Sequence, residues 1–501
     1  MDYKKLQNGS DIRGVALEGI DGEIVNLTSE VVYTIGKAFV AWLRQSGKTA
    51  ISIAVGMDSR LSGQALKEAF AHGITEMGAD VVDCGIASTP AMFMATVDEK
   101  LHATAGVMLT ASHLPYNRNG LKFFTSNGGL DKKDITAILE IAAAGQFENF
   151  SKKGNVTTKP FIDDYSDFLV SYIRKGANNI SDYNQPLRGL KIIVDAGNGA
   201  GGFFAEKVLA QLGADISGSQ FLNPDGRFPN HIPNPEDETA MRSICDAVKI
   251  HHADLGIIFD TDVDRSAVVD KNGNPINRNS LIALISAVIL NEHPGSTIVT
   301  DSITSDGLTK FIEQDLKGKH HRFKRGYKNV INESIRLNES GEESWLAIET
   351  SGHAALRENY FLDDGAYLVA KLLVEMARMN AQGLELTQLI ENLEQPVESK
   401  EYRLHITEPD FANYGNQVLE KMMTKVGMYN GWEIIKPNFE GLRVRSTITG
   451  ENGWFLLRMS LHDPVMPLNI ESNTVGGVSK IRQKLNQIMS GFTGLDITSI
   501  L

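Results

Sequence analysis

The sequence is poor in cysteine, in long hydrophobic runs and in positive charge. Its only two cysteines, Cys84 and Cys245, are too few for a disulfide framework and favour a reducing compartment. The longest predominantly apolar stretch, 281–290, is too short to span a bilayer, and the first residues lead into polar sequence without a signal-peptide core. We therefore expect a cytoplasmic protein with no membrane partner.

The charge balance argues against a second class of partner. The formal net charge is -13, and nucleic acids and anionic membranes require a basic binding face. A local basic pocket for a small anion is still compatible with this balance. With 501 residues, 42% of them hydrophobic, the chain can bury several cores, and its length suggests roughly three or four domains.

Three apolar segments run directly into dense polar clusters. Segment 105–109 leads into Thr110-Ala111-Ser112-His113, segment 255–259 into Asp260-Thr261-Asp262-Val263-Asp264-Arg265, and segment 345–348 into Glu349-Thr350-Ser351-Gly352-His353. Short apolar runs are typical of buried strands, and open parallel sheets bind ligands beyond their strand ends. We therefore expect the three clusters to line one cleft.

The units around these segments repeat. Expected strands at 51–55, 190–194 and 298–301 each precede a helix, and Met77-Gly78-Ala79-Asp80 is echoed by Leu212-Gly213-Ala214-Asp215. Residues 396–501 differ, because strands alternate around 442–445 and 454–458. A closing helix there would carry Val475, Val478, Ile481, Leu485 and Met489 on one side.

This pattern predicts the fold class and the domain limits. We predict an α/β protein with three related mixed α/β-sheet domains and a C-terminal α+β domain around one central cleft. The predicted domains are 1–158 with the serine cluster, 159–274 with the aspartates, 275–395 with the third cluster, and 396–501.

Ser112 could be a nucleophile, a cap or a filler. The recurrence of polar clusters at strand ends favours a nucleophile that carries a phosphoryl group. Lys122, on the run that follows the serine turn, could reach Ser112 as base, acid or phosphate partner. A solvated lysine on an edge strand is the alternative.

Asp260, Asp262 and Asp264 form the most specific cluster. On a regular strand they would share one face, and a tight turn could gather them around a cation. Three carboxylates suit Mg²⁺, which takes its other ligands from water or phosphate. An EF-hand loop does not fit, because it would need glycine at Arg265 and glutamate at Lys271. A solvated acidic turn is the remaining alternative.

The third cluster and the basic turn before it suit a sugar phosphate. His353 could transfer protons near neutral pH, although isolated histidines are often structural. Glu349 and Ser351 offer the acceptor and donor that sugar hydroxyls need, and Lys328 could counter a phosphate.

Two further groups could contact an anion. Arg458, Ser460 and His462 lie close together after an expected strand and can hold a phosphate, although a polar loop would look similar. Arg13 lies in a glycine-flanked loop whose backbone could approach a ligand closely. An exposed surface arginine is the simpler interpretation of that motif alone.

One motif indicates a different chemistry. Gly197-Asn198-Gly199-Ala200-Gly201-Gly202 satisfies G-x-G-x-x-G after a strand, with Asp215 downstream, as in dinucleotide-binding folds. However, Asp215 falls at the start of the next expected strand, whereas a ribose-binding carboxylate belongs at its far end. A nicotinamide-dependent enzyme is therefore a minority alternative.

In this order, the clusters resemble the α-D-phosphohexomutase superfamily of phosphoglucomutases, phosphomannomutases and phosphoglucosamine mutases over nearly the whole chain. The segment 110–115 is similar to its phosphoserine loop, 260–265 to its magnesium loop, 349–353 to its sugar-binding loop and 458–464 to its phosphate-binding loop. The segment 223–231 is similar to a family segment in the second domain.

The resemblance implies a full set of site residues. The implied catalytic residues are Ser112, Lys122, His353, Arg13 and His113. The implied substrate-binding residues are Arg265, Lys328, Glu349, Ser351, Arg458, Ser460 and His462. The implied Mg²⁺ ligands are Ser112, Asp260, Asp262 and Asp264. The chain departs from the family pattern at Leu114, Thr261, Val263, Leu461 and His462, which leaves the sugar preference open.

The implied activity is the interconversion of hexose 1-phosphate and hexose 6-phosphate, of glucose or mannose, through a phosphoserine and a hexose 1,6-bisphosphate that also serves as activator. A phosphoglucosamine mutase, a metal-dependent sugar phosphatase and a non-catalytic sugar-phosphate sensor are the alternatives. Small hexose phosphates are the expected partners, without nucleic acid, and the protein is expected to be a monomer or homodimer.

Overall fold

The structure, a computed structural model, describes residues 2–179, 182–460 and 463–501. It forms two units. The first contains Met1–Asn277 and Ser351–Gln388, and the second contains Arg278–Thr350 and Leu389–Leu501. Across the described residues, each helix is too short or too polar to cross a membrane.

The first domain is built on a mixed eight-stranded sheet. Its main order is β1-β2-β6-β5-β3-β4-β8, with β7 beside β6; β3 is parallel to β4 and β5, whereas β6 is antiparallel to β5. The strands are β1 (Gln7–Asn8), β2 (Asp11–Val15), β3 (Ser52–Met57), β4 (Asp80–Ile86), β5 (Ala105–Leu109), β6 (Arg118–Thr125), β7 (Gly128–Gly129) and β8 (Val156–Thr158). The helices are η1 (Tyr3–Leu6), α1 (Ser29–Gln45), α2 (Gly63–Glu76), α3 (Thr89–Val97) and α4 (Lys132–Ala144).

Alternation along β5 explains how helices cover both faces of this sheet. Ala105, Val107 and Leu109 join the core formed with α1, α2 and α4. Gly106 points the other way, where an added Cβ would lie 1.9 Å from the Met92 carbonyl oxygen of α3. Because both faces are covered, β5 is fully buried and its carboxyl end delivers Ser112.

The second domain carries a four-stranded sheet in the order β12-β11-β10-β9. The helix α6 packs on one face in an apolar core, and α10 contacts β10 and β11. The elements are α5 (Ile162–Ala177), β9 (Ile192–Asp195), η2 (Phe204–Leu209), η3 (Ala210–Leu212), α6 (Glu238–His251), β10 (Leu255–Phe259), β11 (Ser266–Asp270) and β12 (Pro275–Ile276). The same unit contains β16 (Ala354–Leu356), η5 (Arg357–Asn359), β17 (Leu362–Asp363) and α10 (Gly365–Asn380).

The third domain contributes a parallel sheet to the second unit. Within that unit β13 lies between β14 and β15 and is parallel to both. The elements are α7 (Arg278–Glu292), β13 (Thr297–Thr300), α8 (Asp306–Lys310), η4 (Phe311–Asp315), β14 (Lys319–Arg322), α9 (Tyr327–Glu339) and β15 (Ser344–Ile348). The apolar stretch 281–290 lies within α7 and is buried throughout, as expected of a helix that is apolar on all sides.

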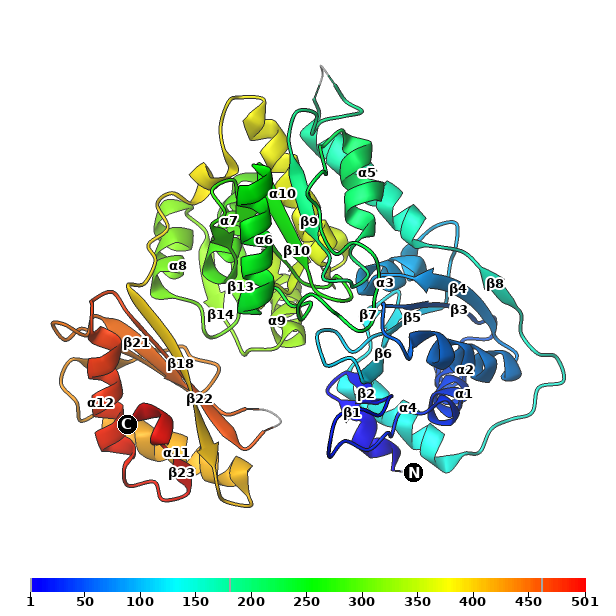
Figure 1. Ribbon diagram of the computed structural model, residues 1–501. Coiled ribbons are helices and arrows are strands. Elements are labelled where there is room, and N and C mark those ends of the chain that lie inside the picture. Colours follow the sequence, from blue (N-terminus) through cyan, green and yellow to red (C-terminus); the bar gives the residue numbers. More distant parts are fainter. Residues whose placement is uncertain (1, 180–181, 461–462) are drawn as a thin grey trace. The chain divides into compact units, whose positions relative to one another are not determined.

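The fourth domain is an antiparallel sheet in the order β19-β20-β21-β22-β18-β23, with α11 and α12 packed against it (Figure 1). The elements are β18 (Glu398–Ile406), α11 (Phe411–Val426), β19 (Trp432–Ile434), β20 (Leu442–Ser446), β21 (Gly453–Leu457), β22 (Val465–Ser472), α12 (Gly477–Met489), β23 (Leu495–Asp496) and η7 (Thr498–Ile500), and η6 (Leu386–Ile390) precedes them. Val478, Ile481, Leu485 and Met489 are buried as predicted. The prediction for Val475 was wrong, because it precedes α12 and is 80% exposed.

Alternation in this sheet directs polar residues toward the third domain within the second unit. Arg443 of β20 donates to the carbonyl oxygens of Ser302 and Thr304, at 2.9 and 3.0 Å, and to Asp306 Oδ1 at 3.0 Å. Its guanidinium carbon lies 3.7 Å from the centroid of a Trp454 ring. A buried arginine therefore joins the third and fourth domains.

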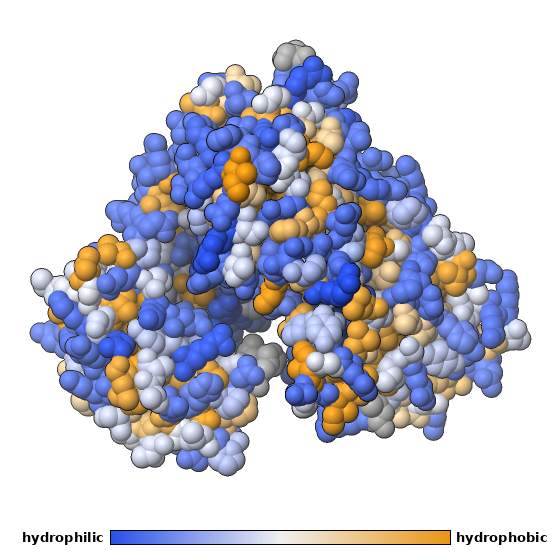
Figure 2. Space-filling view, viewed as in Figure 1, coloured by the Kyte–Doolittle hydropathy of each residue, from blue (hydrophilic) through white to orange (hydrophobic). Residues whose placement is uncertain are grey.

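The predicted fold class is confirmed, with three mixed α/β-sheet domains and a C-terminal domain of antiparallel strands and helices. Polar residues cover most of the face shown in Figure 2, with apolar residues in small patches between them. This is the surface expected when the apolar strands and helix faces form the cores. The domain limits themselves stay predictions.

Candidate active site

Ser112 begins a tight loop at the carboxyl end of β5. Its φ is +51°, a left-handed conformation that residues other than glycine seldom adopt outside special sites. The Ser112 backbone N–H donates to Thr110 Oγ1 at 2.9 Å, and the Thr110 hydroxyl donates to Asp58 Oδ2 at 2.7 Å. The loop is therefore held by a chain of buried hydrogen bonds.

Arg60 is the second support of the serine loop. Its guanidinium donates to the carbonyl oxygens of Ser112, of Leu114 at 2.7 Å, of Pro115 at 2.8 Å and of Arg118 at 2.9 Å. It also pairs with Asp58, Nε to Oδ2, at 3.2 Å, and both side chains are fully buried. Burial raises the pKa of Asp58 to about 6 although the adjacent guanidinium opposes the shift.

Asp260, Asp262 and Asp264 follow β10 and are all buried, with carboxylate oxygens within 4.8 Å of one another. Two of these oxygens, Asp262 Oδ1 and Asp264 Oδ1, accept no hydrogen bond from the described residues. Buried carboxylate oxygens of this kind are costly unless a cation or donor satisfies them. The residues therefore fit a Mg²⁺ ion, which prefers oxygen ligands.

The backbone of the aspartate loop is tightly constrained. Val263 has φ +69°, unusual for a β-branched residue and worth roughly 1–2 kcal/mol of strain. An added Cβ on Gly199 would lie 2.7 Å from the Thr261 carbonyl oxygen, and Ala200 N–H donates to that oxygen at 2.8 Å. The G-x-G-x-x-G turn thus supports the aspartate loop, which accounts for its glycines without a dinucleotide.

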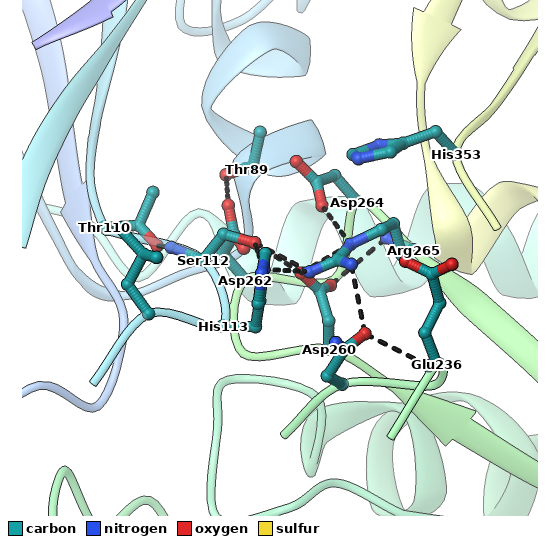
Figure 3. A network of polar contacts seen from close by, with 12 residues as sticks. Thr89, Thr110, Ser112, His113, Glu236, Asp260, Asp262, Asp264, Arg265 and His353 are labelled. Atoms are coloured by element: carbon teal, nitrogen blue, oxygen red, sulfur yellow. Dashed lines mark hydrogen bonds and ion pairs between the residues drawn. The ribbon is translucent and has the colours of Figure 1, made fainter. Parts of the chain in front are cut away.

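Ser112 meets the aspartates directly. The Ser112 hydroxyl donates to Asp260 Oδ2 at 3.0 Å, and Arg265 Nη2 donates to Ser112 Oγ at 2.9 Å (Figure 3). Arg265 also donates to Asp260 Oδ2 at 3.0 Å. Burial and the neighbouring Asp264 raise the pKa of Asp260. The Ser112 hydroxyl, the Asp260 carboxylate and the Arg265 guanidinium are therefore hydrogen-bonded to one another in a buried site.

The two histidines of the site have opposite charge preferences. Burial and the guanidinium of Arg265 lower the pKa of His113 to about 3, and Arg265 Nη2 lies 2.7 Å from its Nδ1. Burial opposes the charged form of His353, but the carboxylates of Asp363 and Asp264 raise its pKa to about 9. His353 Nδ1 lies 2.5 Å from Asp363 Oδ2. These shifts favour a neutral His113 and a charged His353 at neutral pH.

Lys122 lies on β6, between β2 and β5, and is not the edge-strand lysine of the alternative interpretation. Its Nζ donates to Asp262 Oδ2 at 2.9 Å and to Asp264 Oδ2 at 2.5 Å. The lysine is 6% exposed and stands among the carboxylates. It therefore offsets part of their negative charge through their Oδ2 atoms.

Arg13 lies in strand β2, and the expected loop is wrong there because residues 12–15 pair with β6. The Arg13 side chain is half-buried and donates to Asp11 Oδ2 at 3.0 Å. Its charge is one of the causes that lower the pKa of His113, after burial and Arg265. Arg13 is thus within electrostatic range of the serine loop.

The second unit gathers the expected sugar and phosphate residues of its two domains. Glu349 follows β15, and its Oε1 accepts the Gly326 N–H at 2.6 Å, which ties it to the turn that begins α9 and carries Lys328. The Arg325 N–H donates to Glu440 Oε2 at 3.2 Å across the interface of the third and fourth domains. These residues therefore meet within a single unit.

The remaining expected residues lie on loops of both units. Arg458 follows β21, and burial lowers its pKa. Ser460 N–H donates to the Val465 carbonyl oxygen at 2.9 Å. Ser351 is buried in the first unit. His462 and the departure at Leu461 lie outside the described residues.

Comparisons with known proteins identify the family. The chain matches three domain families described as phosphoglucomutase/phosphomannomutase, alpha/beta/alpha domains I, II and III, over residues 4–149, 170–273 and 277–397. This chain belongs to the phosphoglucomutase/phosphomannomutase family. The confirmed resemblance rests on matches along most of the chain rather than on one motif.

Relatives and a solved structure agree with this family. The chain is 31% identical over 474 residues to a phosphoglucomutase of Neisseria meningitidis, covering 94% of this chain and 95% of that protein. It is 30% identical over 473 residues to a phosphomannomutase/phosphoglucomutase of Pseudomonas syringae, covering 94% and 92%. A crystal structure of a phosphoglucomutase/phosphomannomutase family protein from Burkholderia thailandensis has a TM-score of 0.79, 27% identity and 98% coverage of both chains.

Sequence reasoning missed several polar residues of this family member's site. Asp58 and Arg60 hold the serine loop, Asp363 holds His353, and Arg325 joins Glu440. Asp58 and Arg60 follow the expected strand at 51–55, so the same strand-end signal that indicated Ser112 was available for them. Asp363 and Arg325 carry no comparable signal, because Asp363 meets His353 only through the pairing of β16 with β17, and the Glu440 partner of Arg325 lies in another domain.

Proposed function

We propose that this family member interconverts hexose 1-phosphate and hexose 6-phosphate, with glucose or mannose as the sugar, through a phosphorylated Ser112. The observation that carries the proposal is the contact of Ser112 Oγ with Asp260 at 3.0 Å and with Arg265 at 2.9 Å. A phosphoserine carries nearly two negative charges near pH 7, so a phosphorylated Ser112 needs positively charged groups such as Arg265 beside it. The names of the relatives support glucose and mannose.

Each half-reaction moves one phosphoryl group. The bond from phosphorus to Ser112 Oγ breaks, a bond to the free sugar hydroxyl forms, and a hexose 1,6-bisphosphate results. The sugar hydroxyl gives its proton to a base, and Ser112 Oγ takes up a proton as its bond to phosphorus breaks. When the other phosphoryl group goes back to Ser112, the serine hydroxyl gives up its proton and the released sugar oxygen takes one. We assign these proton transfers to Lys122 and His353, which lie beside the aspartates; the one that accepts the hydroxyl proton does so in its deprotonated form, and the protonated one supplies the proton to the leaving oxygen.

The site residues hold the transferring group by charge and position. Asp260, Asp262 and Asp264 would hold Mg²⁺ together with an oxygen on Ser112, and the ion would neutralise charge on the phosphoryl oxygens. Arg265 donates toward Ser112 Oγ, and neutral His113 accepts from the same guanidinium. Arg13 lies within electrostatic range of this loop and adds positive charge.

Further groups are available for the sugar and its non-reacting phosphate. We assign Glu349 of the second unit and Ser351 of the first unit to sugar hydroxyls, and Lys328, Arg458, Ser460 and His462 to the phosphate. Because the bisphosphate must react from either end, a separate phosphate grip is required in both orientations. The poverty in cysteine supports action in the cytoplasm, and a monomer or homodimer stays the expected state.

The decisive experiment measures both products of the reaction. Purified protein with Mg²⁺ and a trace of hexose 1,6-bisphosphate is given glucose 1-phosphate, mannose 1-phosphate or glucosamine 1-phosphate. Hexose 6-phosphate without inorganic phosphate supports the mutase and ranks the sugars. Stoichiometric inorganic phosphate would instead indicate a phosphatase, and binding without either product would indicate a sensor.

A matched pair of serine variants locates the chemistry. Ser112→Ala removes the phosphoryl carrier and should lower turnover by several powers of ten. Ser126→Ala changes an exposed serine of the same domain and should keep normal turnover. Equal turnover of the two variants would contradict the role of Ser112.

A further inference from the structure

The segment 223–237 of the second domain touches charged residues on two sides of Ser112. At its start, an added Cβ on Gly226 would lie 2.4 Å from the Ser59 carbonyl oxygen and 2.5 Å from the Leu61 nitrogen. The Phe228 ring centroid lies 5.4 Å from the guanidinium carbon of Arg60. The segment therefore packs against the turn whose Arg60 holds the serine loop.

The middle of the segment is anchored by a buried ion pair. His231 Nε2 lies 3.0 Å from both carboxylate oxygens of Asp195, and His231 Nδ1 lies 2.9 Å from the Ile232 carbonyl oxygen. Since both partners are acceptors, both ring nitrogens must donate, which requires the charged imidazolium. Burial opposes that charge, but Asp195 raises the pKa of His231 above its ordinary value.

The end of the segment reaches Arg265. Asn234 Oδ1 accepts from Arg265 Nη1 at 3.1 Å and from the Glu236 N–H at 3.1 Å. Pro233 and Pro235 flank Asn234 and restrict the backbone on both sides of it. Figure 3 shows Glu236 beside the guanidinium, on the side away from Ser112 and His113. Asn234 is thus a hydrogen-bond acceptor for Nη1 of Arg265, on a conformationally restricted backbone.

We propose that Asn234, whose segment is anchored by the His231–Asp195 ion pair, is a positioning residue for phosphoryl transfer. Asn234 holds Nη1 of Arg265, and this fixes the planar guanidinium so that Nη2 faces Ser112 Oγ. The inference rests on the proposed function, because it concerns the donor that faces the transferring group. A fixed donor costs no reorganisation when charge develops, so its loss slows the transfer step more than it weakens substrate binding.

The first test compares substitutions at Asn234 with a control on the same segment. Asn234→Ala should lower kcat by about 10- to 100-fold with little change in KM for hexose phosphate. Asn234→Asp keeps an oxygen acceptor for both donors and should recover most of kcat. Arg227→Ala, on the same segment, removes a 73% exposed side chain paired with Asp225 and should behave as wild type.

A double-mutant cycle separates positioning from a merely structural role. Lysine at 265 cannot present a second nitrogen to Asn234, so Asn234→Ala should have little further effect on kcat in an Arg265→Lys background. A structural role predicts that the two losses multiply. Multiplying losses, a changed KM with normal kcat, or wild-type kcat in Asn234→Ala would each overturn the inference.

Two further observations complete the test. Asn234→Ala could melt at a temperature well below that of the wild type. In that case kcat is compared instead between Asn234→Asp alone and Asn234→Asp in the Arg265→Lys background. A large loss of kcat in the single Asn234→Asp variant would overturn the inference. The wild-type assay distinguishes the two proposals. Absence of mutase turnover in the wild type refutes the proposed function, whereas normal wild-type turnover with an unaffected Asn234→Ala variant refutes only the role of Asn234.

Discussion

The Ser112 hydroxyl donates to Asp260 Oδ2 across 3.0 Å and thereby joins a loop after β5 to a loop after β10. The two residues belong to different domains of one unit. Their contact places the proposed phosphoryl carrier against the proposed metal ligands. Changes on either side of this contact should therefore affect the transfer step.

The first prediction concerns the metal. Asp262 Oδ1 accepts no hydrogen bond from the described residues, and Asp262→Asn, which removes this carboxylate charge, should raise the Mg²⁺ concentration for half-maximal rate by about 10-fold or more. Mg²⁺ should also raise the melting temperature of the wild type more than that of the variant, because a ligand of the folded state stabilises it. Initial rates after chelation and metal titration measure the first effect, and thermal unfolding measures the second.

The control for the metal prediction is Asp246→Asn, which changes an exposed carboxylate of α6. This variant should respond to Mg²⁺ as the wild type does. Full turnover of chelated wild-type protein would contradict the assignment of the three aspartates.

The second prediction concerns Lys122. Lys122→Met should lower kcat by about 10²- to 10⁴-fold, since a proton-transfer group is lost. It should also lower the Mg²⁺ concentration for half-maximal rate, because the ammonium no longer offsets Asp262 and Asp264. The opposite changes in kcat and metal requirement are measured in one titration. Lys133→Met, at an exposed lysine of α4, serves as control, and a higher metal requirement in Lys122→Met would count against this account.

The third prediction concerns the buried pair Arg60–Asp58. Arg60→Met should destabilise the protein by about 3–5 kcal/mol, because it leaves a buried carboxylate without its partner. Arg60→Met with Asp58→Asn should regain part of this stability. Turnover should stay low in both, since the carbonyl oxygens of Ser112 and Leu114 lose their donor. Denaturant unfolding measures the stability of both variants, and steady-state kinetics measures their kcat. If turnover recovered together with stability in the double variant, the serine loop would not need the Arg60 guanidinium.

The fourth prediction is a pH dependence of stability in the second unit. Burial raises the pKa of Glu471 from 4.5 to about 7, although Arg443 and the Trp454 N–H favour its charged form; Asp306 adds to the shift and Arg322 opposes it. The folded state therefore binds the proton more tightly. The stabilisation is complete below pH 4.5 and is lost as the pH rises toward 7.

Glu471→Gln removes this titration while keeping an acceptor for Trp454. Relative to wild type, the variant should become more stable by about 1–3 kcal/mol between pH 4.5 and 7, and the difference should be constant above that range. Denaturant unfolding across this pH range measures the difference. A pH-independent difference would refute the assignment to Glu471.

The sequence allowed accurate prediction of features that depend on neighbouring residues. Ser112 and the three aspartates follow buried strands as expected, because apolar runs and the polar residues behind them are local patterns. The same reasoning placed the apolar side of α12, but it extended that side to Val475 beyond the helix start. Periodicity identifies a helix better than its first residue.

Contacts between segments that are distant in sequence could not be predicted. Arg60 follows β3 and contacts the serine loop that follows β5 of the same sheet, and Asn234 contacts Arg265 only because the segment 223–237 folds back. No periodicity signals such contacts. The glycines at 197–202 form a recognisable motif that suggested dinucleotide binding. In the structure the backbone of Thr261 packs against this motif, so the motif supports the aspartate loop.

The central claim is that Ser112 carries the transferred phosphoryl group. The most direct measurement is the intact mass of the protein, with peptide mapping, after treatment with glucose 1,6-bisphosphate and again after excess glucose 1-phosphate. The account predicts one phosphate, on Ser112, that exchanges with the sugar's other phosphoryl group during turnover and is lost from the protein only when the bisphosphate dissociates. Mutase turnover with Ser112 unmodified throughout, or undiminished in Ser112→Ala, would contradict it.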